Sequence, residues 1–350
     1  MLTDRAEVSK GRLLALPKAE LHVHLDGSLR PRTMVELASE RGVSLPTSDP
    51  DELGRRMVAT DARSLEDYLL RFQLILSVMQ DRGALERIAY ELAEDNAREG
   101  VRWLEVRYCP VLNTRGGLSL EGAIESALDG LHRAEHDFPI RTGVILCAIR
   151  DHDPAESSAI AAAGVAYRER GVVGFDLAGP ERGYPAAAHR DAFRAAAAGG
   201  LGITVHAGEA YGPESIEQAL DDCGAQRIGH GTRLHQNAAL LKRVRDHRVP
   251  LEVCITSNVQ TAAVASADVH PVRAYYEAGV AVTLNTDNRL VSGTTVTDEY
   301  WLAHRALGLG WSELLEIART GFRSAFLPDG EKRALIERVE TEMARLDSGG

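Results

Sequence analysis

The sequence predicts an α/β protein that folds as a (β/α)8 barrel. Its 350 residues, 44% of them hydrophobic, are enough for one large domain with a sizeable core. Short apolar runs alternate with helical stretches, which is typical of parallel strands joined by right-handed crossovers. The apolar runs number eight, as a closed barrel of this kind requires. We expect residues 1–350 to form a single domain.

The eight apolar runs are the predicted strands. They are Glu20–Leu25, Val101–Tyr108, Arg141–Ile149, Val172–Leu177, Leu201–His206, Arg227–His230, Val249–Ile255 and Val280–Asn285. The predicted helices between them are Leu118–Phe138, Ala155–Arg170, Ala186–Gly199, Ser215–Cys223, Ala238–His247 and Val272–Ala278. An open, doubly wound sheet is the alternative, and the absence of a G-x-G-x-x-G motif at the start of any helix argues against it.

Two helical regions extend this pattern. The first, about residues 28–100, follows the first strand and carries apolar residues such as Leu65, Tyr68 and Leu69 at helical spacing. An insert at this point is expected to form a lid over the end of the strand, although a packing layer outside the barrel would show the same periodicity. The second region begins after Thr297, and we expect helices from there to the end of the chain.

Charge and composition exclude several classes of partner. The net charge of −11 repels phosphate backbones and anionic lipid, so neither nucleic acid nor a membrane is expected to bind, and small molecules remain. No apolar run approaches the roughly 20 residues of a membrane span. The opening residues include Asp4, Arg5 and Glu7, unlike a signal peptide, and the four cysteines form no C-x-x-C pair. These features predict a cytoplasmic protein.

Histidines and carboxylates close the first, fifth, sixth and eighth predicted strands. The carboxyl ends of barrel strands meet at one mouth, so these side chains are expected to converge. His22 and His24 alternate with apolar residues and therefore share one face of their strand, although ordinary polar residues on a half-exposed strand would do the same. Three imidazoles and a carboxylate suit zinc. The predicted ligands are His22, His24, His206 and Asp287.

Six short motifs follow one another over about residues 17–297. They are Pro17–Ser28 (PKAELHVHLDGS), Gly174–Glu181 (GFDLAGPE), His206–Glu209 (HAGE), Arg227–Gly231 (RIGHG), Thr256–Asn258 (TSN) and Leu284–Asp287 (LNTD). In this order they resemble the adenosine deaminase family of the amidohydrolase superfamily. The resemblance implies a hydrolase with one Zn²⁺ per chain that converts adenosine or 2′-deoxyadenosine to inosine or 2′-deoxyinosine and releases ammonia.

The resemblance also implies a role for individual residues. Glu209 would protonate ring N1, and His230 would position the attacking water and help to remove its proton. The chemistry agrees, because zinc can lower the pKa of water from 15.7 to about 7 and protonation of N1 opens C6 to attack. The implied metal ligands are again His22, His24, His206 and Asp287. The implied substrate-binding residues are His24, Asp26 near a ribose hydroxyl, Gly179 through its backbone amide, and Asn288.

Asn288 departs from the family pattern, which has a second aspartate here that bonds purine N7. An asparagine amide donates a hydrogen bond without needing a proton, so purine binding is expected to depend less on pH. The departure leaves the substrate open, and the alternative is another adenine compound, such as adenine or aminofutalosine. A non-catalytic purine-binding relative is a further alternative, and the intact acid and ligands argue against it.

Two other hydrolase chemistries do not match the sequence. Two-metal amidohydrolases often carry a carboxylated lysine on the fourth strand, and here that strand ends Asp176-Leu177-Ala178. Enzymes of the cytidine deaminase type need H-x-E and P-C-x-x-C, and neither is present. Nothing in the sequence indicates the oligomeric state. The remaining histidines are expected to be surface or packing residues: His132, His136, His152, His189, His235, His247, His270 and His304.

Overall fold

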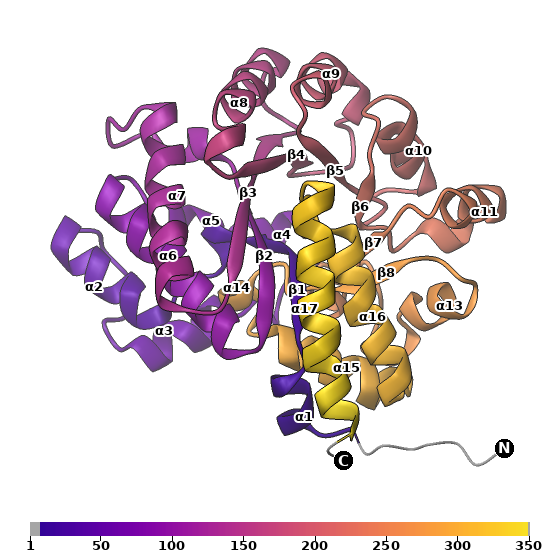
Figure 1. Cartoon of the computed structure of the whole chain (residues 1–350). Coiled ribbons are helices and arrows are strands. Elements are labelled where there is room, and N and C mark those ends of the chain that lie inside the picture. Colours follow the sequence, from indigo (N-terminus) through magenta and orange to yellow (C-terminus); the bar gives the residue numbers. More distant parts are fainter. Residues whose placement is uncertain (1–7, 349–350) are drawn as a thin grey trace, which may run out of the picture.

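Eight parallel strands form the centre of the computed structural model, which describes residues 8–348 (Figure 1). Each strand pairs with the next in the chain. A parallel bridge between Val23 and Asp287 joins the end of the last strand to the first. The predicted (β/α)8 barrel is therefore confirmed. The expectation that the chain does not begin with a signal peptide rested on Asp4, Arg5 and Glu7. These three residues lie outside the described residues.

The observed strands follow the predicted apolar runs closely. They are β1 (Lys18–His24), β2 (Val101–Tyr108), β3 (Arg141–Ile149), β4 (Val172–Ala178), β5 (Gly202–Ala207), β6 (Arg227–His230), β7 (Leu251–Val253) and β8 (Val282–Leu284). The main difference is β7, which ends before Cys254. The apolar run continues there because Ile255, the first residue of a helix, is buried as deeply as the strand, so burial alone did not mark the boundary.

Helices surround the strands (Figure 1). Several begin at a side chain that accepts from a free backbone amide, as Asp81 and Ser119 do. Those of the insert and the chain start are α1 (Lys10–Ala15), α2 (Pro31–Arg41), α3 (Pro50–Met57), α4 (Leu65–Leu69), α5 (Phe72–Leu76) and α6 (Arg82–Arg98). Those between later strands are α7 (Leu120–Asp137), α8 (Pro154–Ala166), α9 (Arg190–Ala198), α10 (Pro213–Asp221), α11 (Ala238–Asp246), α12 (Ile255–Gln260) and α13 (Val272–Glu277). After β8 come α14 (Arg289–Ser292), α15 (Val296–Leu307), α16 (Trp311–Ser324) and α17 (Asp329–Ser348).

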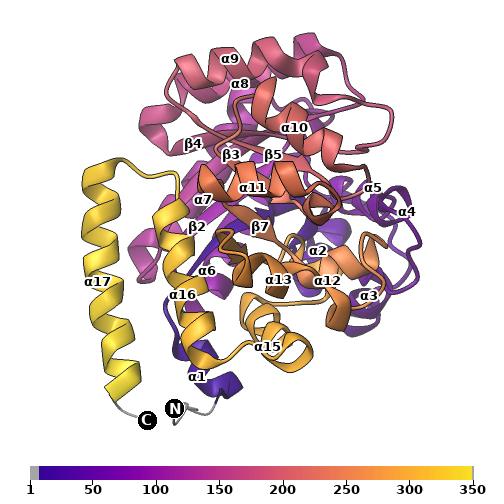
Figure 2. The same ribbon diagram turned by 90° about the vertical axis from the view of Figure 1, so that its right-hand side faces the viewer.

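The insert after β1 divides into two parts. Its last helix, α6, packs beside α7 outside the strands, as a packing layer would. The short helices α4 and α5 instead contribute Leu65, Tyr68 and Phe72 to the wall of a pocket at the barrel mouth. Figure 2 shows these two helices on the opposite side of the barrel from α17. The insert thus supplies both an outer layer and a cover for the mouth.

The C-terminal helices pack where the barrel closes. Helix α16 lies against β1 and β8, and α17 packs on α16. Arg12 of α1 donates to the carbonyl of Leu346 at 3.2 Å, which joins the two ends of the described chain. None of the helices within residues 8–348 is long and apolar enough to cross a membrane.

Candidate active site

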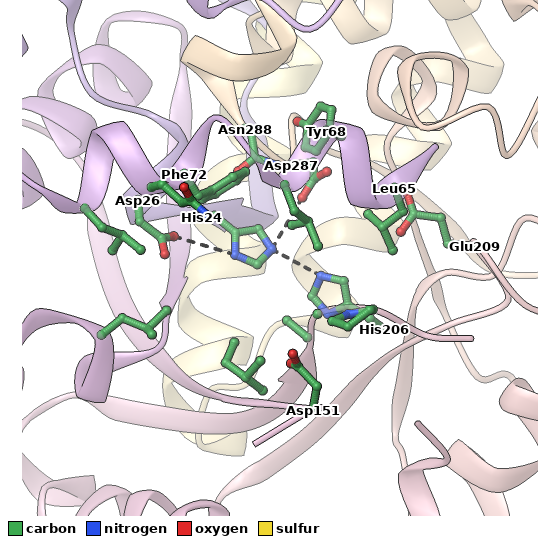
Figure 3. Close-up of a pocket in the computed structure, with 18 of the residues that line it drawn as sticks. His24, Asp26, Leu65, Tyr68, Phe72, Asp151, His206, Glu209, Asp287 and Asn288 are labelled. Atoms are coloured by element: carbon green, nitrogen blue, oxygen red, sulfur yellow. Dashed lines mark hydrogen bonds and ion pairs between the residues drawn. The ribbon is translucent and has the colours of Figure 1, made fainter. Parts of the chain in front are cut away.

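The four predicted metal ligands lie together at the carboxyl ends of their strands. His24 Nε2 is 3.1 Å from His206 Nε2 and 3.4 Å from Asp287 Oδ1, and these side chains point toward one another (Figure 3). His22 Nε2 is 3.3 Å from the same oxygen of Asp287. Strand pairing produces this arrangement, because the backbone of Asp287 bonds to both His22 and His24 across the closure of the barrel.

His230 at the end of β6 also reaches this point. The ligand atoms of His22, His206, His230 and Asp287 all lie within 4.8 Å of one another. His230 and Asp287 have φ angles of 62° and 61°, a left-handed conformation that is uncommon for residues other than glycine and is concentrated at functional sites. His22, His206, His230 and Asp287 thus form one compact group, and His24 lies beside it in contact with His206 and Asp287.

Two buried carboxylates orient two of these imidazoles. Glu252 Oε2 lies 2.9 Å from His22 Nδ1, and Asp176 Oδ2 lies 2.9 Å from His206 Nδ1. Burial alone would raise the pKa of both carboxyls, but neighbouring charges, Arg107 among them, hold both pKa values well below their usual range. An ionised carboxylate only accepts hydrogen bonds, so both imidazoles donate from Nδ1 and direct Nε2 at the cluster.

His22 has the electronic form that a metal ligand needs. Burial lowers its pKa to about 4, with a further contribution from the charge of Arg107, so the ring is neutral at neutral pH. With its proton on Nδ1, the lone pair is on Nε2. That nitrogen is fully buried and has no hydrogen-bond partner among the described residues. A metal ion would satisfy it.

The sequence interpretation did not assign the residues behind the ligands. Arg107, Asp176 and Glu252 lie inside or at the end of apolar strands and are completely buried. Charged residues are rarely buried unless they are paired, so a charged residue within an apolar strand could have indicated a buried ion pair. The partners could not be inferred, because Arg107 on β2 pairs with Asp176 on β4 and Glu252 on β7, which are not its neighbouring strands.

Glu209 follows β5 and faces the cluster. Its Oε2 is 3.5 Å from His230 Nε2, and its Oε1 accepts a hydrogen bond from Thr261 Oγ1 at 2.9 Å. The side chain is buried, and burial raises its pKa. A carboxyl group with a raised pKa beside a ligand-binding pocket is suited to carry a proton during a reaction.

A second glutamate holds the loop on which Glu209 sits. The Glu181 carboxylate, near the end of the GFDLAGPE motif, accepts hydrogen bonds from consecutive backbone amides. The distances are 2.5 Å from Gly208, 3.1 Å from Glu209, 2.6 Å from Ala210 and 2.8 Å from Tyr211. The Ser215 hydroxyl also donates to Glu181. Glu181 therefore sets the position of Glu209 relative to the cluster.

Replacement of Glu181 by glutamine is expected to lower kcat by about 10²-fold, because displacement of a reacting group by about 1 Å has an effect of that size. The glutamine amide would direct N–H groups at backbone N–H groups that now share one carboxylate oxygen. Steady-state kinetics and metal content measure the effect. Glu217→Gln, which alters a carboxylate that accepts a hydrogen bond from the side chain of Asn237, is the control. Unchanged kcat in Glu181→Gln would contradict this role.

A pocket of about 320 Å³ opens beside the cluster, and the predicted substrate-binding residues line it: His24, Asp26, Gly179 and Asn288. Gly179 has a φ of 94°, which favours glycine. Asp26 Oδ1 is buried without a hydrogen-bond partner among residues 8–348, so it is free to accept from a ligand. Asn288 packs directly on Gly27, where an added Cβ would lie 1.7 Å from Asn288 Oδ1.

Other residues of the pocket were not predicted to bind the substrate. Leu65, Tyr68 and Phe72 form an apolar wall from the insert, and Asp151 and His152 contribute polar groups from the loop after β3. His152, which was expected to be a surface or packing residue, thus lines the pocket. Its position directly after a barrel strand was the available signal, because such loops carry the ligand-binding groups.

The comparisons with known proteins agree with this geometry. The adenosine deaminase family model matches residues 17–342. The chain belongs to the adenosine deaminase family. It is similar to an adenosine deaminase of Shewanella woodyi, with 40% identity over 93% of this chain and 99% of the relative. It is also 40% identical to a probable adenosine deaminase of Dictyostelium discoideum, of which it spans 42%. The resemblance of the six motifs is confirmed.

Solved structures show how the family varies its substrates. An adenine deaminase from Arthrobacter aurescens has a TM-score of 0.87 and 29% identity, covering 94% of this chain and 99% of that one. An N6-methyl-AMP deaminase from Arabidopsis thaliana has a TM-score of 0.84 and 30% identity, covering 95% and 98%. As a member of the adenosine deaminase family, this chain is a metal-dependent deaminase, a hydrolase that acts on carbon–nitrogen bonds.

Proposed function

We propose that this enzyme uses one zinc ion to deaminate adenosine and 2′-deoxyadenosine to inosine and 2′-deoxyinosine, with release of ammonia. The observation that carries the proposal is the placement of Glu209 beside the histidine–aspartate cluster, at the wall of a mostly apolar pocket. A flat heterocycle in that pocket would lie against both a proton donor and a site for water.

Zinc fits the donor set. His22, His24, His206 and Asp287 supply three nitrogens and one oxygen, the ligand types that Zn²⁺ prefers. The unpartnered Nε2 of His22 supports a cation at this point. When bound, zinc would lower the pKa of water toward neutrality and make it a nucleophile.

The remaining residues act on the substrate and the water. Glu209 protonates ring N1 as the C6–O bond forms, because the aromatic ring resists attack until it gains that proton. His230 positions the water and assists the loss of its proton. Gly179 donates its backbone amide to the purine, and Asp26 accepts from a ribose hydroxyl. Asn288 donates its side-chain amide to N7 without needing to be protonated.

The lining of the pocket favours a nucleoside. Within residues 8–348, the side chains that line the pocket include no lysine or arginine, and a carboxylate such as Asp151 would repel a nucleotide phosphate. Free adenine would leave the buried Asp26 without its hydroxyl partner, and an unpaired buried polar group lowers affinity. The apolar wall of α4 and α5 supplies contact area beyond the purine ring.

We also propose that residues 1–350 form one domain and that the enzyme acts in the cytoplasm. The family model covers the chain from strand β1 into α17, which supports a single unit. All four cysteines are buried and unpaired, as expected in a reducing compartment.

A substrate panel tests the function. Zinc-loaded protein is mixed with adenosine, 2′-deoxyadenosine, adenine, AMP and an aminofutalosine-type compound, and loss of the adenine absorbance band is followed. The two nucleosides are expected to exceed adenine in kcat/KM by about 10²-fold or more, because contacts remote from the reacting carbon contribute to the rate. Preference for another member of the panel would overturn the substrate assignment, and no reaction with any member would overturn the proposed activity.

A further inference from the structure

A chain of hydrogen bonds leads from the backbone of α13 to His230. The amide of Val272 donates to His270 Nδ1 at 3.1 Å. His270 Nε2 lies 3.1 Å from Asn258 Oδ1, and Asn258 Nδ2 lies 3.0 Å from His230 Nδ1. The side chains of His270, Asn258 and His230 are almost completely buried. No role has so far been assigned to His270 or Asn258, and the expectation for His270 was packing.

The backbone amide fixes the direction of every bond in this chain. A peptide N–H can only donate, so His270 Nδ1 must accept and carry no proton. Burial lowers the pKa of His270 to about 3, with a further contribution from His230, so the ring is neutral and its one proton is on Nε2. That proton is donated to Oδ1 of Asn258, which turns the amide nitrogen of Asn258 toward His230.

We propose that His270 and Asn258 are positioning residues that hold His230 with its proton on Nε2. Asn258 Nδ2 donates to His230 Nδ1, which therefore presents a lone pair to Asn258, so the proton of the ring is on the other nitrogen. That Nε2–H faces the pocket and lies 3.5 Å from Glu209 Oε2. The consequence for catalysis rests on the proposed deamination.

The opposite tautomer does not fit the chain. With its proton on Nδ1, His230 would need an acceptor from Asn258, so the Asn258 amide would have to turn around. Its NH2 group would then face His270 Nε2, which already carries the proton of that ring. Two donors would meet in a buried site, and neither would have an acceptor.

The tautomer decides how His230 assists the loss of the water proton. With Nε2 already protonated, His230 donates a hydrogen bond to the attacking oxygen as negative charge develops on it, and it does not itself take the proton. The Glu209 carboxyl group gives its proton to ring N1 as the C6–O bond forms. The O–H bond of water breaks, and its proton passes to the Glu209 carboxylate, so Glu209 ends the addition step unchanged and the atoms balance.

Nitrogen NMR tests the tautomer directly. Zinc-loaded and metal-free protein labelled with [15N]histidine is examined by long-range 1H–15N correlation, which distinguishes a protonated ring nitrogen from one with a lone pair. The His230 signals are assigned by their absence from His230→Gln. The proton is expected on Nε2 in the wild type and in the control His304→Gln, which alters a histidine bonded to the Leu309 carbonyl. A proton on Nδ1 in the wild type would overturn the proposal.

Asn258→Asp tests whether the chain sets this tautomer. Aspartate can only accept, so it is expected to draw a proton onto His230 Nδ1 and to lower kcat by about 10–100-fold with little change in KM, the size of effect seen for residues that orient a functional group. His270→Gln is the second variant, in case the first does not fold. Unchanged nitrogen shifts and kcat in a folded variant would overturn the positioning role. A wild-type Nε2 proton in a protein that deaminates no nucleoside would instead overturn the proposed function.

Discussion

Replacement of Glu209 by glutamine is expected to lower kcat for adenosine by at least about 10²–10⁴-fold, the usual contribution of a positioned acid or base. Glutamine keeps the shape of the side chain and can still accept from Thr261. It cannot carry a proton between the water and ring N1. Glu209 is not among the proposed ligands, so the zinc content is expected to stay near one ion per chain.

Two measurements separate this effect from a loss of structure. The variant is compared with wild type in kcat and zinc content, and Glu214→Gln serves as a control because it changes an exposed glutamate at the start of α10. A ground-state analogue of the substrate should still bind, since the apolar wall and Asp26 are unaltered. Near-normal turnover by Glu209→Gln would refute its role as the proton carrier.

The strand–helix order was predictable because burial in a barrel has a simple signature. Parallel strands covered on both sides become short apolar runs, and four predicted boundaries at β2 and β3 match the structure to the residue. The same signature fails at β7, where Ile255 is as buried as the strand but begins α12. The hydrophobic pattern indicates which residues are buried. It does not distinguish a three-residue strand from the helix that follows it.

The site was predictable to the extent that it lies at strand ends. His22, His206 and Asp287 could be brought together because the carboxyl ends of barrel strands share one mouth. The groups that orient these ligands could not be predicted. Glu252 on β7 contacts His22 on β1, Asp176 on β4 contacts His206 on β5, and both pairs depend on which side chains face inward. The hydrogen-bond chain through His270 depends on a single backbone amide, which no sequence pattern marks.

Metal content should separate His24 from His230, the two histidines that compete for one place in the cluster. The hydrogen-bond chain puts the proton of His230 on Nε2, and a protonated nitrogen has no lone pair for a metal. In the part of the chain that the structure describes, no such donor reaches Nδ1 of His24, which lies 3.9 Å from Asp26. Its Nε2 faces His206 and Asp287. We therefore expect His24 to bind zinc and His230 to remain outside the coordination shell.

His24→Ala is accordingly expected to weaken zinc binding by more than about 100-fold, since loss of a residue that only orients a ligand already costs about 10–100-fold. His230→Ala is expected to keep zinc and lose most of its kcat. Competition with a chelator of known affinity measures the zinc affinity of both variants, and steady-state kinetics measures kcat. His136→Ala is the control, because His136 is exposed on α7. The opposite result, with zinc lost from His230→Ala and kept by His24→Ala, would make the ligands His22, His206, His230 and Asp287. It would also overturn the inference that His230 carries its proton on Nε2.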